Sequence, residues 1–150
     1  MNEFKAVLGA MAGTVGACLS QLFGGWSANM TTLCIFMLID YLTGLLVAGV
    51  FHNSPKSETG ALESKAGWKG LVRKGVTLAI VLIGARLDIA LGVNFAKDGV
   101  IYGFMLIEAL SILENAGLMG IKYPAFLTQA LDLLNKKADK LPTGGDTDDE

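Results

Sequence analysis

Five charged side chains fall inside apolar stretches of the sequence, where lipid would not solvate them. They are Asp40, Arg86, Asp88, Glu108 and Glu114. At the centre of a membrane helix each charge costs about 2.5–3.5 kcal/mol, so such residues usually face one another, a partner subunit or water. The chemistry that these residues indicate is a polar contact between helices or a water-lined path.

The densest group of polar residues lies in the segment "EALSILENAG". On a helix, Glu108, Ser111, Glu114 and Asn115 share an arc of about 120°, and the rest of the surface is apolar. Asp40, Thr43 and Gly44 form a similar but smaller stripe. The candidates for lining a pore or for making polar helix contacts are therefore Asp40, Thr43, Asp88, Glu108, Ser111, Glu114 and Asn115.

Acids outnumber bases within these apolar stretches. Arg86 is the one base, and we expect it to form an ion pair between helices because it and Asp88 point to opposite sides of their own helix. In the alternative interpretation, each acid simply pairs or hydrogen-bonds within a static bundle. Since no other internal base is expected, the remaining acids would be protonated or solvated by a water-filled lumen.

The elements that carry these residues are long and apolar. The chain is 52% hydrophobic and 17% charged, against about 25% charged residues in soluble domains. No Asp, Glu, Lys or Arg lies between Lys5 and Asp40, which leaves room for two membrane spans. We expect an all-α integral membrane protein with four transmembrane helices, three being possible. The four predicted spans are Ala6–Phe23, Thr31–Phe51, Val76–Phe95 and Gly99–Gly120.

The spans divide the chain into hairpins separated by polar segments. Pro124 can open a further helix with one apolar face, which would lie on the membrane surface or pair with a partner. The predicted organisation is a first transmembrane hairpin (1–51), a basic cytoplasmic connector (52–75), a second transmembrane hairpin (76–120), an amphipathic cytoplasmic helix (121–141) and a disordered acidic tail (142–150).

The basic residues predict an orientation with both termini in the cytoplasm. With four spans, nearly all Lys and Arg fall on one side of the membrane, and only Lys97 lies on the other. The topology determinants in the connector are Lys65, Lys69, Arg73 and Lys74.

An internal resemblance supports the count of four. The segment "FMLIDYLTGLLVAG" (36–49) aligns without gaps to "FMLIEALSILENAG" (104–117), and Asp40 then corresponds to Glu108. More than half of the aligned positions are identical. The pattern predicts a duplicated pair of helices, both copies running the same way through the membrane.

Small residues recur four positions apart in several spans. Such spacing allows close helix packing in membranes, so a homo-oligomer within the lipid bilayer is plausible. The packing candidates are Gly9, Gly13, Gly44, Ala48, Gly99 and Gly103.

The remaining reactive residue types form no recognisable site. Cys18, Cys34 and His52 are too scattered for a metal or redox centre. There is no phosphate-binding glycine loop and no nucleophile–histidine pair in a predicted span. We expect no enzyme activity, no cofactor and no nucleic-acid partner.

Four segments resemble the toxin-secretion/phage-lysis holin family of Gram-positive bacteria and their phages. They are "DYLTGLLVAG" (40–49), "SKAGWKGLVRKG" (64–75), "ARLDIALG" (85–92) and "EALSILENAGLMGIKYP" (108–124). The match runs over about residues 30–140, and Arg86 departs from the family pattern.

The resemblance implies a small protein that accumulates in the bacterial cytoplasmic membrane and assembles into non-selective lesions. Those lesions release an endolysin or a toxin, so an endolysin is a functional partner that need not touch the chain. Family members are often drawn with three spans. A small ion channel or transporter and a passive membrane scaffold are the alternatives, because intramembrane acids also occur there.

Overall fold

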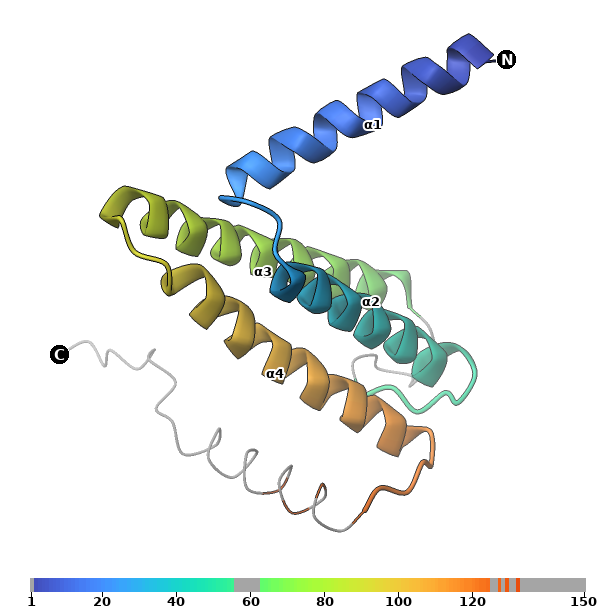
Figure 1. Ribbon diagram of the computed structural model, residues 1–150. Coiled ribbons are helices and arrows are strands. Elements are labelled where there is room, and N and C mark those ends of the chain that lie inside the picture. Colours follow the sequence, from blue (N-terminus) through green and yellow to red (C-terminus); the bar gives the residue numbers. More distant parts are fainter. Residues whose placement is uncertain (1, 56–62, 125–126, 128, 130–131, 133–150) are drawn as a thin grey trace, which may run out of the picture. The chain divides into compact units, whose positions relative to one another are not determined.

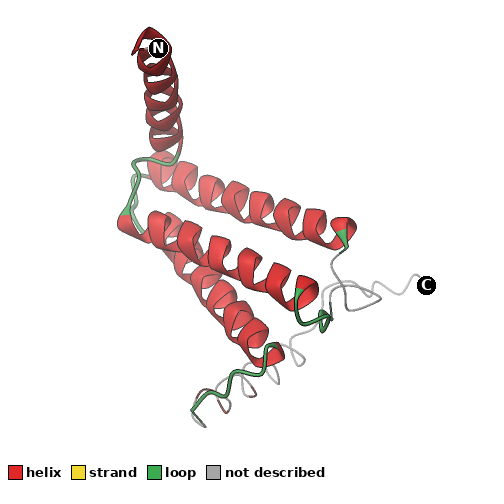
Figure 2. Cartoon of the chain, turned by 90° about the vertical axis from the view of Figure 1, so that its right-hand side faces the viewer, coloured by secondary structure: helices red, strands yellow, loops and turns green. Residues whose placement is uncertain are grey.

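The described part of the chain is helical throughout. The computed structural model describes residues 2–55, 63–124, 127, 129 and 132. In order, the helices are α1 (Asn2–Leu22), α2 (Ala28–Gly49), α3 (Ser64–Leu91) and α4 (Ala96–Leu118). Short loops join α1 to α2 and α3 to α4 (Figure 2). They belong to one compact unit, Met1–Met119, and a second unit spans Gly120–Glu150.

Helices α2, α3 and α4 form a bundle, and α1 projects away from it (Figure 1). Helix α4 packs against both α2 and α3, whereas α2 and α3 touch each other over only a short stretch. The core is built from large apolar side chains near one end of the bundle. Its buried members are Phe23, Met30, Leu33, Met37, Val81 and Ile101.

Helix α1 buries none of its residues against the rest of the chain. Two glycines end it, Gly24 and Gly25, with φ of 64° and 98°, a conformation that residues with a Cβ rarely adopt. Ser27 then caps α2, because its side chain accepts a hydrogen bond from the backbone N–H of Met30 at 3.2 Å. The apolar surface of α1 is therefore left for lipid or for another polypeptide.

Helix α3 begins earlier than the hydropathy pattern predicts. It starts at Ser64, so its first turns occupy the segment expected as a connector (52–75). Lys and Arg are good helix formers, and a helix need not stop where a membrane span does. The expected topology determinants Lys65, Lys69, Arg73 and Lys74 are all helical.

Two described helices, α2 and α4, are long and apolar enough to cross a membrane. Large apolar side chains are exposed around the bundle and along α1, which suits contact with lipid. The membrane helices expected from the sequence thus find support in α2 and α4. The count of four spans and the duplicated hairpin stay predictions. The two predicted hairpins differ, because α3 packs along α4 whereas α1 buries none of its residues.

The expected amphipathic helix (121–141) lies mostly outside the described residues, and the acidic tail (142–150) lies wholly outside them. Near the start of that segment, the backbone N–H of Leu127 donates to the carbonyl of Pro124 at 2.9 Å.

Candidate functional site

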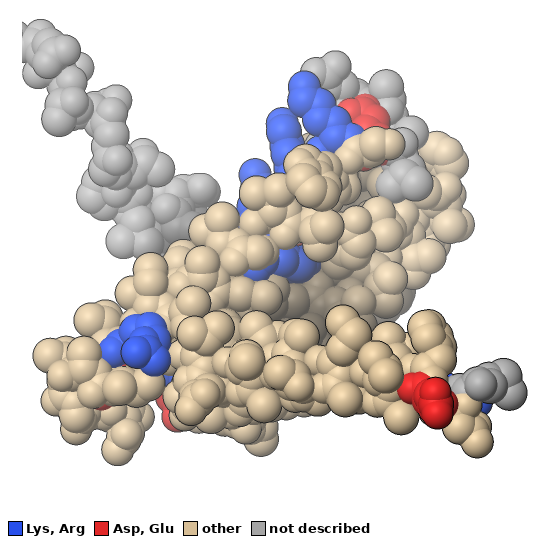
Figure 3. All heavy atoms as spheres, turned by 90° about the horizontal axis from the view of Figure 1, so that it is seen from above, with Lys and Arg blue, Asp and Glu red and all other residues tan. Residues whose placement is uncertain are grey.

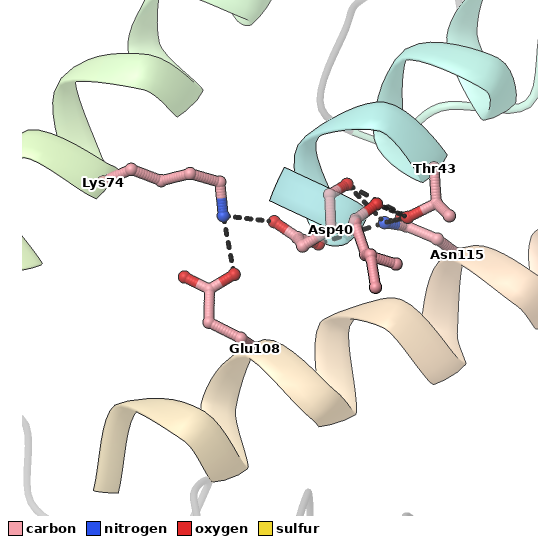
Figure 4. A network of polar contacts seen from close by, with 6 residues as sticks. Asp40, Thr43, Lys74, Glu108 and Asn115 are labelled. Atoms are coloured by element: carbon pink, nitrogen blue, oxygen red, sulfur yellow. Dashed lines mark hydrogen bonds and ion pairs between the residues drawn. The ribbon is translucent and has the colours of Figure 1, made fainter. Parts of the chain in front are cut away.

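A single lysine joins two acids from different helices in the middle of the bundle. The Lys74 ammonium lies 2.8 Å from the Asp40 carboxylate and 2.6 Å from the Glu108 carboxylate. The three side chains are only 13%, 12% and 9% exposed, respectively. Figure 4 shows Lys74 reaching from α3 between the acids on α2 and α4. This arrangement ties all three bundle helices together.

Asn115 extends the network from α4 to α2. Its side-chain amide nitrogen donates to the Asp40 carboxylate at 3.1 Å, to the Asp40 carbonyl at 3.3 Å and to the Thr43 hydroxyl at 3.0 Å. Asn115 is buried, so these bonds replace the water that its amide would otherwise bind. The two polar stripes predicted on these helices therefore face each other.

The spacing of the buried positions explains why these side chains meet. A seven-residue repeat keeps one face of each helix toward its neighbours, as in left-handed helical packing. The buried or nearly buried positions in this register are Leu33, Asp40 and Val47 on α2, Lys74, Val81 and Asp88 on α3, and Ile101, Glu108 and Asn115 on α4.

The expectation that no internal base faces these acids is wrong. It treated Lys74 as part of a solvated connector, but Lys74 is helical and lies on the buried face of α3. The signal that could have found it is its register, seven residues before Val81 and fourteen before Asp88. The Lys74, Asp40 and Glu108 charges sum to one negative charge instead of two.

The other predicted polar residues of α3 and α4 separate into inward and outward positions. Ser111 is half-buried beside the network, whereas Glu114 is exposed at the edge of the polar stripe. Arg86, expected to form an ion pair between helices, is also exposed. In the described residues it makes no ion pair, so the base that joins the helices here is Lys74.

Asp88, a candidate for lining a pore or for making a polar helix contact, contacts the backbone at the start of α4. Its two carboxylate oxygens accept hydrogen bonds from the backbone N–H groups of Ala96 and Lys97, each at 2.9 Å. These groups open α4, where an acid both satisfies unpaired donors and complements the helix dipole. Asp88 therefore fixes the α3–α4 turn.

Lys97, the basic residue expected on the far side of the membrane, forms hydrogen bonds with backbone carbonyls just after α1. Its ammonium donates to the carbonyls of Phe23 at 3.2 Å and Gly25 at 3.4 Å. A base at the carboxyl end of a helix satisfies carbonyls that have no partner in the helix.

The predicted packing residues differ in their surroundings. A side chain at Gly44 would meet the Asn115 amide at 3.8 Å, and Ala48 is buried. Those at Gly9, Gly13, Gly99 and Gly103 would meet nothing within 4 Å. Among the glycines of the described residues, the tightest surroundings are at Gly84, which was not predicted, where a Cβ would lie 3.2 Å from the Lys97 Cα.

A pocket of about 610 Å³ opens beside the network. Residues of α2, α3 and α4 line it, and Asp40, Lys74 and Glu108 are among them. Elsewhere in the described residues, no three His, Cys, Asp or Glu side chains are grouped as a metal site requires.

Comparison with known proteins gives consistent relatives. An uncharacterised protein of Clostridium perfringens (strain 13 / Type A) is 33% identical over 82% of this chain and 87% of its own. One of Listeria monocytogenes is 35% identical over 82% and 83% of the two chains. A probable holin of Bacillus phage phi105 is 27% identical over 72% and 75%. No solved structure matches the chain.

The model of the bacteriophage holin family matches residues 17–136. That range contains all three bundle helices and the whole polar network. The chain belongs to the bacteriophage holin family.

Proposed function

We propose that the chain is a holin that assembles with copies of itself in the bacterial cytoplasmic membrane and opens non-selective lesions. Through these lesions an endolysin, or in a toxin-producing host a toxin, would leave the cytoplasm. Membership of a membrane-permeabilising, non-enzymatic family supports this role. The two apolar helices, α2 and α4, support its place in the membrane.

The observation that carries the proposal is the enclosed polar network. Asp40, Lys74, Glu108 and Asn115 are bonded to one another inside a single chain, so a lone subunit can accumulate in lipid without exposing them. The network nevertheless retains one net negative charge and several groups that water could solvate. It therefore stabilises a closed subunit and also supplies the polar surface that an open lesion needs.

Opening would exchange contacts within the chain for contacts with water and with other copies. When α2 and α4 separate, the stripe with Asp40 and Thr43 and the stripe with Glu108, Ser111 and Asn115 become lumen-lining surfaces. Homo-oligomers suit this exchange because each copy contributes both stripes. The apolar surface of α1, which nothing in the described chain covers, is free to contact lipid or neighbouring copies.

The proposed topology has four spans with both termini in the cytoplasm. The basic first turns of α3, with Lys65, Lys69 and Arg73 exposed, would then lie at the cytoplasmic surface. Lys97 and the α1–α2 turn would lie at the opposite surface.

The function can be tested by inducible expression in a bacterial host with a membrane-potential dye, with and without a co-expressed endolysin. A holin gives abrupt, delayed and non-selective collapse of the potential, and lysis only when the endolysin is present. Early and ion-selective flux would instead indicate a channel or transporter. Absence of any flux would indicate a passive scaffold.

A double variant tests the lumen-lining role. We expect Glu108→Leu with Glu114→Leu to insert normally and to lose lysis, because the polar stripe of α4 is reduced to Ser111 and Asn115. Lysis on the normal schedule by this variant would rule out a lumen formed by that stripe.

A further inference from the structure

The lining of the pocket beside the network combines apolar and basic side chains, as a binding site for an amphipathic molecule requires. The apolar part of its lining comes from Leu45 and Ala48 of α2 and from Phe104 and Ile107 of α4, and the same helices contribute the polar Asp40, Glu108 and Ser111. Lys69 and Arg73 line it from α3. A volume of about 610 Å³ is within the usual range of about 300–1,000 Å³ for small-molecule sites.

Lys69 and Arg73 form the rim of this pocket. Both are exposed, whereas Lys74, one residue further, points into the bundle and is held by its two acids. Lys69 and Arg73 are four residues apart, so they lie one above the other on one face of α3. They can therefore bind a ligand group at the mouth of the pocket, while Lys74 is already paired.

The adjoining face of α3 has the composition of a membrane–water interface. Trp68 is 67% exposed, and Leu71 and Val72 beside it are also exposed. Trp is enriched at the level of lipid head groups, and Lys and Arg there attract anionic lipid. Figure 3 shows several Lys and Arg side chains together on one part of a mostly uncharged face, with acidic side chains beside them and a second basic patch elsewhere.

Glycines shape the pocket wall that adjoins this rim. A Cβ at Gly67 would lie 3.7 Å from the Tyr41 hydroxyl, and one at Gly70 would lie 3.8 Å from the Tyr41 ring. The absence of side chains at Gly67 and Gly70 thus lets Tyr41 of α2 lie close to α3 in the lining of the pocket. Tyr41 and Leu45 belong to α2, which is apolar and long enough to span a membrane.

We propose that this pocket binds one anionic phospholipid, with its phosphate group between Lys69 and Arg73 and its apolar part along the walls from α2 and α4. Charge complementarity identifies the ligand. At the mouth of the pocket the lining holds two bases, Lys69 and Arg73, and one acid, Glu63. The other two acids of the lining, Asp40 and Glu108, are engaged by Lys74. The proposal does not rest on lesion formation, since a channel or a scaffold with this pocket would bind the same lipid.

The test uses the full-length protein in mild detergent, titrated with phosphatidylglycerol and followed by native mass spectrometry. We expect one phosphatidylglycerol per chain, in clear preference to phosphatidylcholine. Arg73→Gln should weaken binding about fivefold, the effect of one basic residue near an anionic membrane surface. Lys65→Gln, which removes the same charge from the same helix but lies outside the pocket lining, should weaken it less than about twofold.

A charge-neutral variant separates the pocket from the surface charge. Ala66 lines the pocket, so Ala66→Phe should fill part of it and reduce lipid retention with every base still present. Circular dichroism establishes that each variant is folded, and if Ala66→Phe does not fold, the comparison of Arg73→Gln with Lys65→Gln decides alone.

Three results would overturn the proposal. Equal losses in Arg73→Gln and Lys65→Gln would mean diffuse attraction to the helix surface. Retention of phosphatidylcholine as strong as that of phosphatidylglycerol would exclude recognition of the anionic phosphate group. Displacement of the lipid by millimolar inorganic phosphate would mean a site for free phosphate and not for a lipid.

Discussion

Lys74→Met is the substitution that most directly perturbs the polar network. It keeps an unbranched side chain, one atom shorter, and makes α3 more apolar, so insertion into the membrane is not impaired. It also leaves Asp40 and Glu108 enclosed without the ammonium that lies 2.8 Å and 2.6 Å from them. The three side chains are each less than a sixth exposed, so water can reach the place of the lost partner only from the pocket that they line.

The geometry gives the size of the effect. At an effective dielectric constant of about 20, each of these contacts corresponds to roughly 6 kcal/mol of Coulomb attraction. Desolvation of the three groups offsets much of that attraction. Removing one partner of a buried pair typically costs about 3–5 kcal/mol, because the other charge is left without compensation. We therefore expect Lys74→Met to lower the free energy of unfolding by about 3–5 kcal/mol.

Two further variants make the test specific. Lys65→Met removes a base from an exposed position of the same helix and should change stability by less than about 0.5 kcal/mol. The triple variant Asp40→Asn, Lys74→Met, Glu108→Gln removes all three charges. It should recover most of the loss, since neutral replacements of a buried ion pair are often tolerated.

The assay is reversible unfolding of the full-length protein in mixed micelles, followed by far-ultraviolet circular dichroism. The reasoning is refuted if Lys74→Met is as stable as Lys65→Met. It is also refuted if the triple variant is no more stable than Lys74→Met, because uncompensated charge would then not be the cause of the loss.

Three other substitutions test separate parts of the fold by the same unfolding assay. Gly84→Ala should destabilise the protein by about 1–3 kcal/mol, because its Cβ would meet the α4 backbone at 3.2 Å. The control Gly99→Ala, whose Cβ would meet nothing within 4 Å, should be neutral or stabilising. Equal effects of the two substitutions would contradict the close approach at Gly84. Asp88→Ala should lower the free energy of unfolding by about 0.5–2 kcal/mol, because it removes the cap of α4. The control Glu114→Gln, at an exposed position, should lower it by less than about 0.5 kcal/mol. Equal losses in the two variants would exclude the capping role of Asp88. Asn115→Ala should cost about 1–3 kcal/mol by removing its hydrogen bonds to Asp40 and Thr43 on α2, and an unchanged stability would show that water replaces the amide.

The sequence was sufficient to predict the helices and the faces that carry their polar residues. The stripes around Asp40 and around Glu108 were visible because polar residues are rare in apolar segments and helical periodicity places them on one side. Their mutual contact through Asn115 and Thr43 follows once both stripes must avoid lipid. These inferences depend only on local periodicity and on the cost of burying charge.

Lys74 could not be assigned by hydropathy because it lies where a basic segment meets an apolar one. A hydropathy window averages Lys74 with Arg73 and Lys69 and so places all three in solvent. Only the packing of α3 against α2 and α4 separates the inward lysine from the outward bases. The partners of Asp88 could not be predicted for a related reason, since they are the backbone N–H groups that open α4.

The central claim is that the polar stripes are enclosed in the resting subunit and face water in the lesion. Its most direct test is labelling of Thr43→Cys, in a chain with Cys18 and Cys34 replaced, by a membrane-impermeant thiol reagent added to cells. Leu42→Cys, on the exposed apolar face of α2, is the matched control. The account predicts that Thr43→Cys is unlabelled before the potential collapses and labelled immediately afterwards, with Leu42→Cys unlabelled throughout. Labelling of Thr43→Cys before collapse, or its continued protection in fully permeable cells, would contradict it.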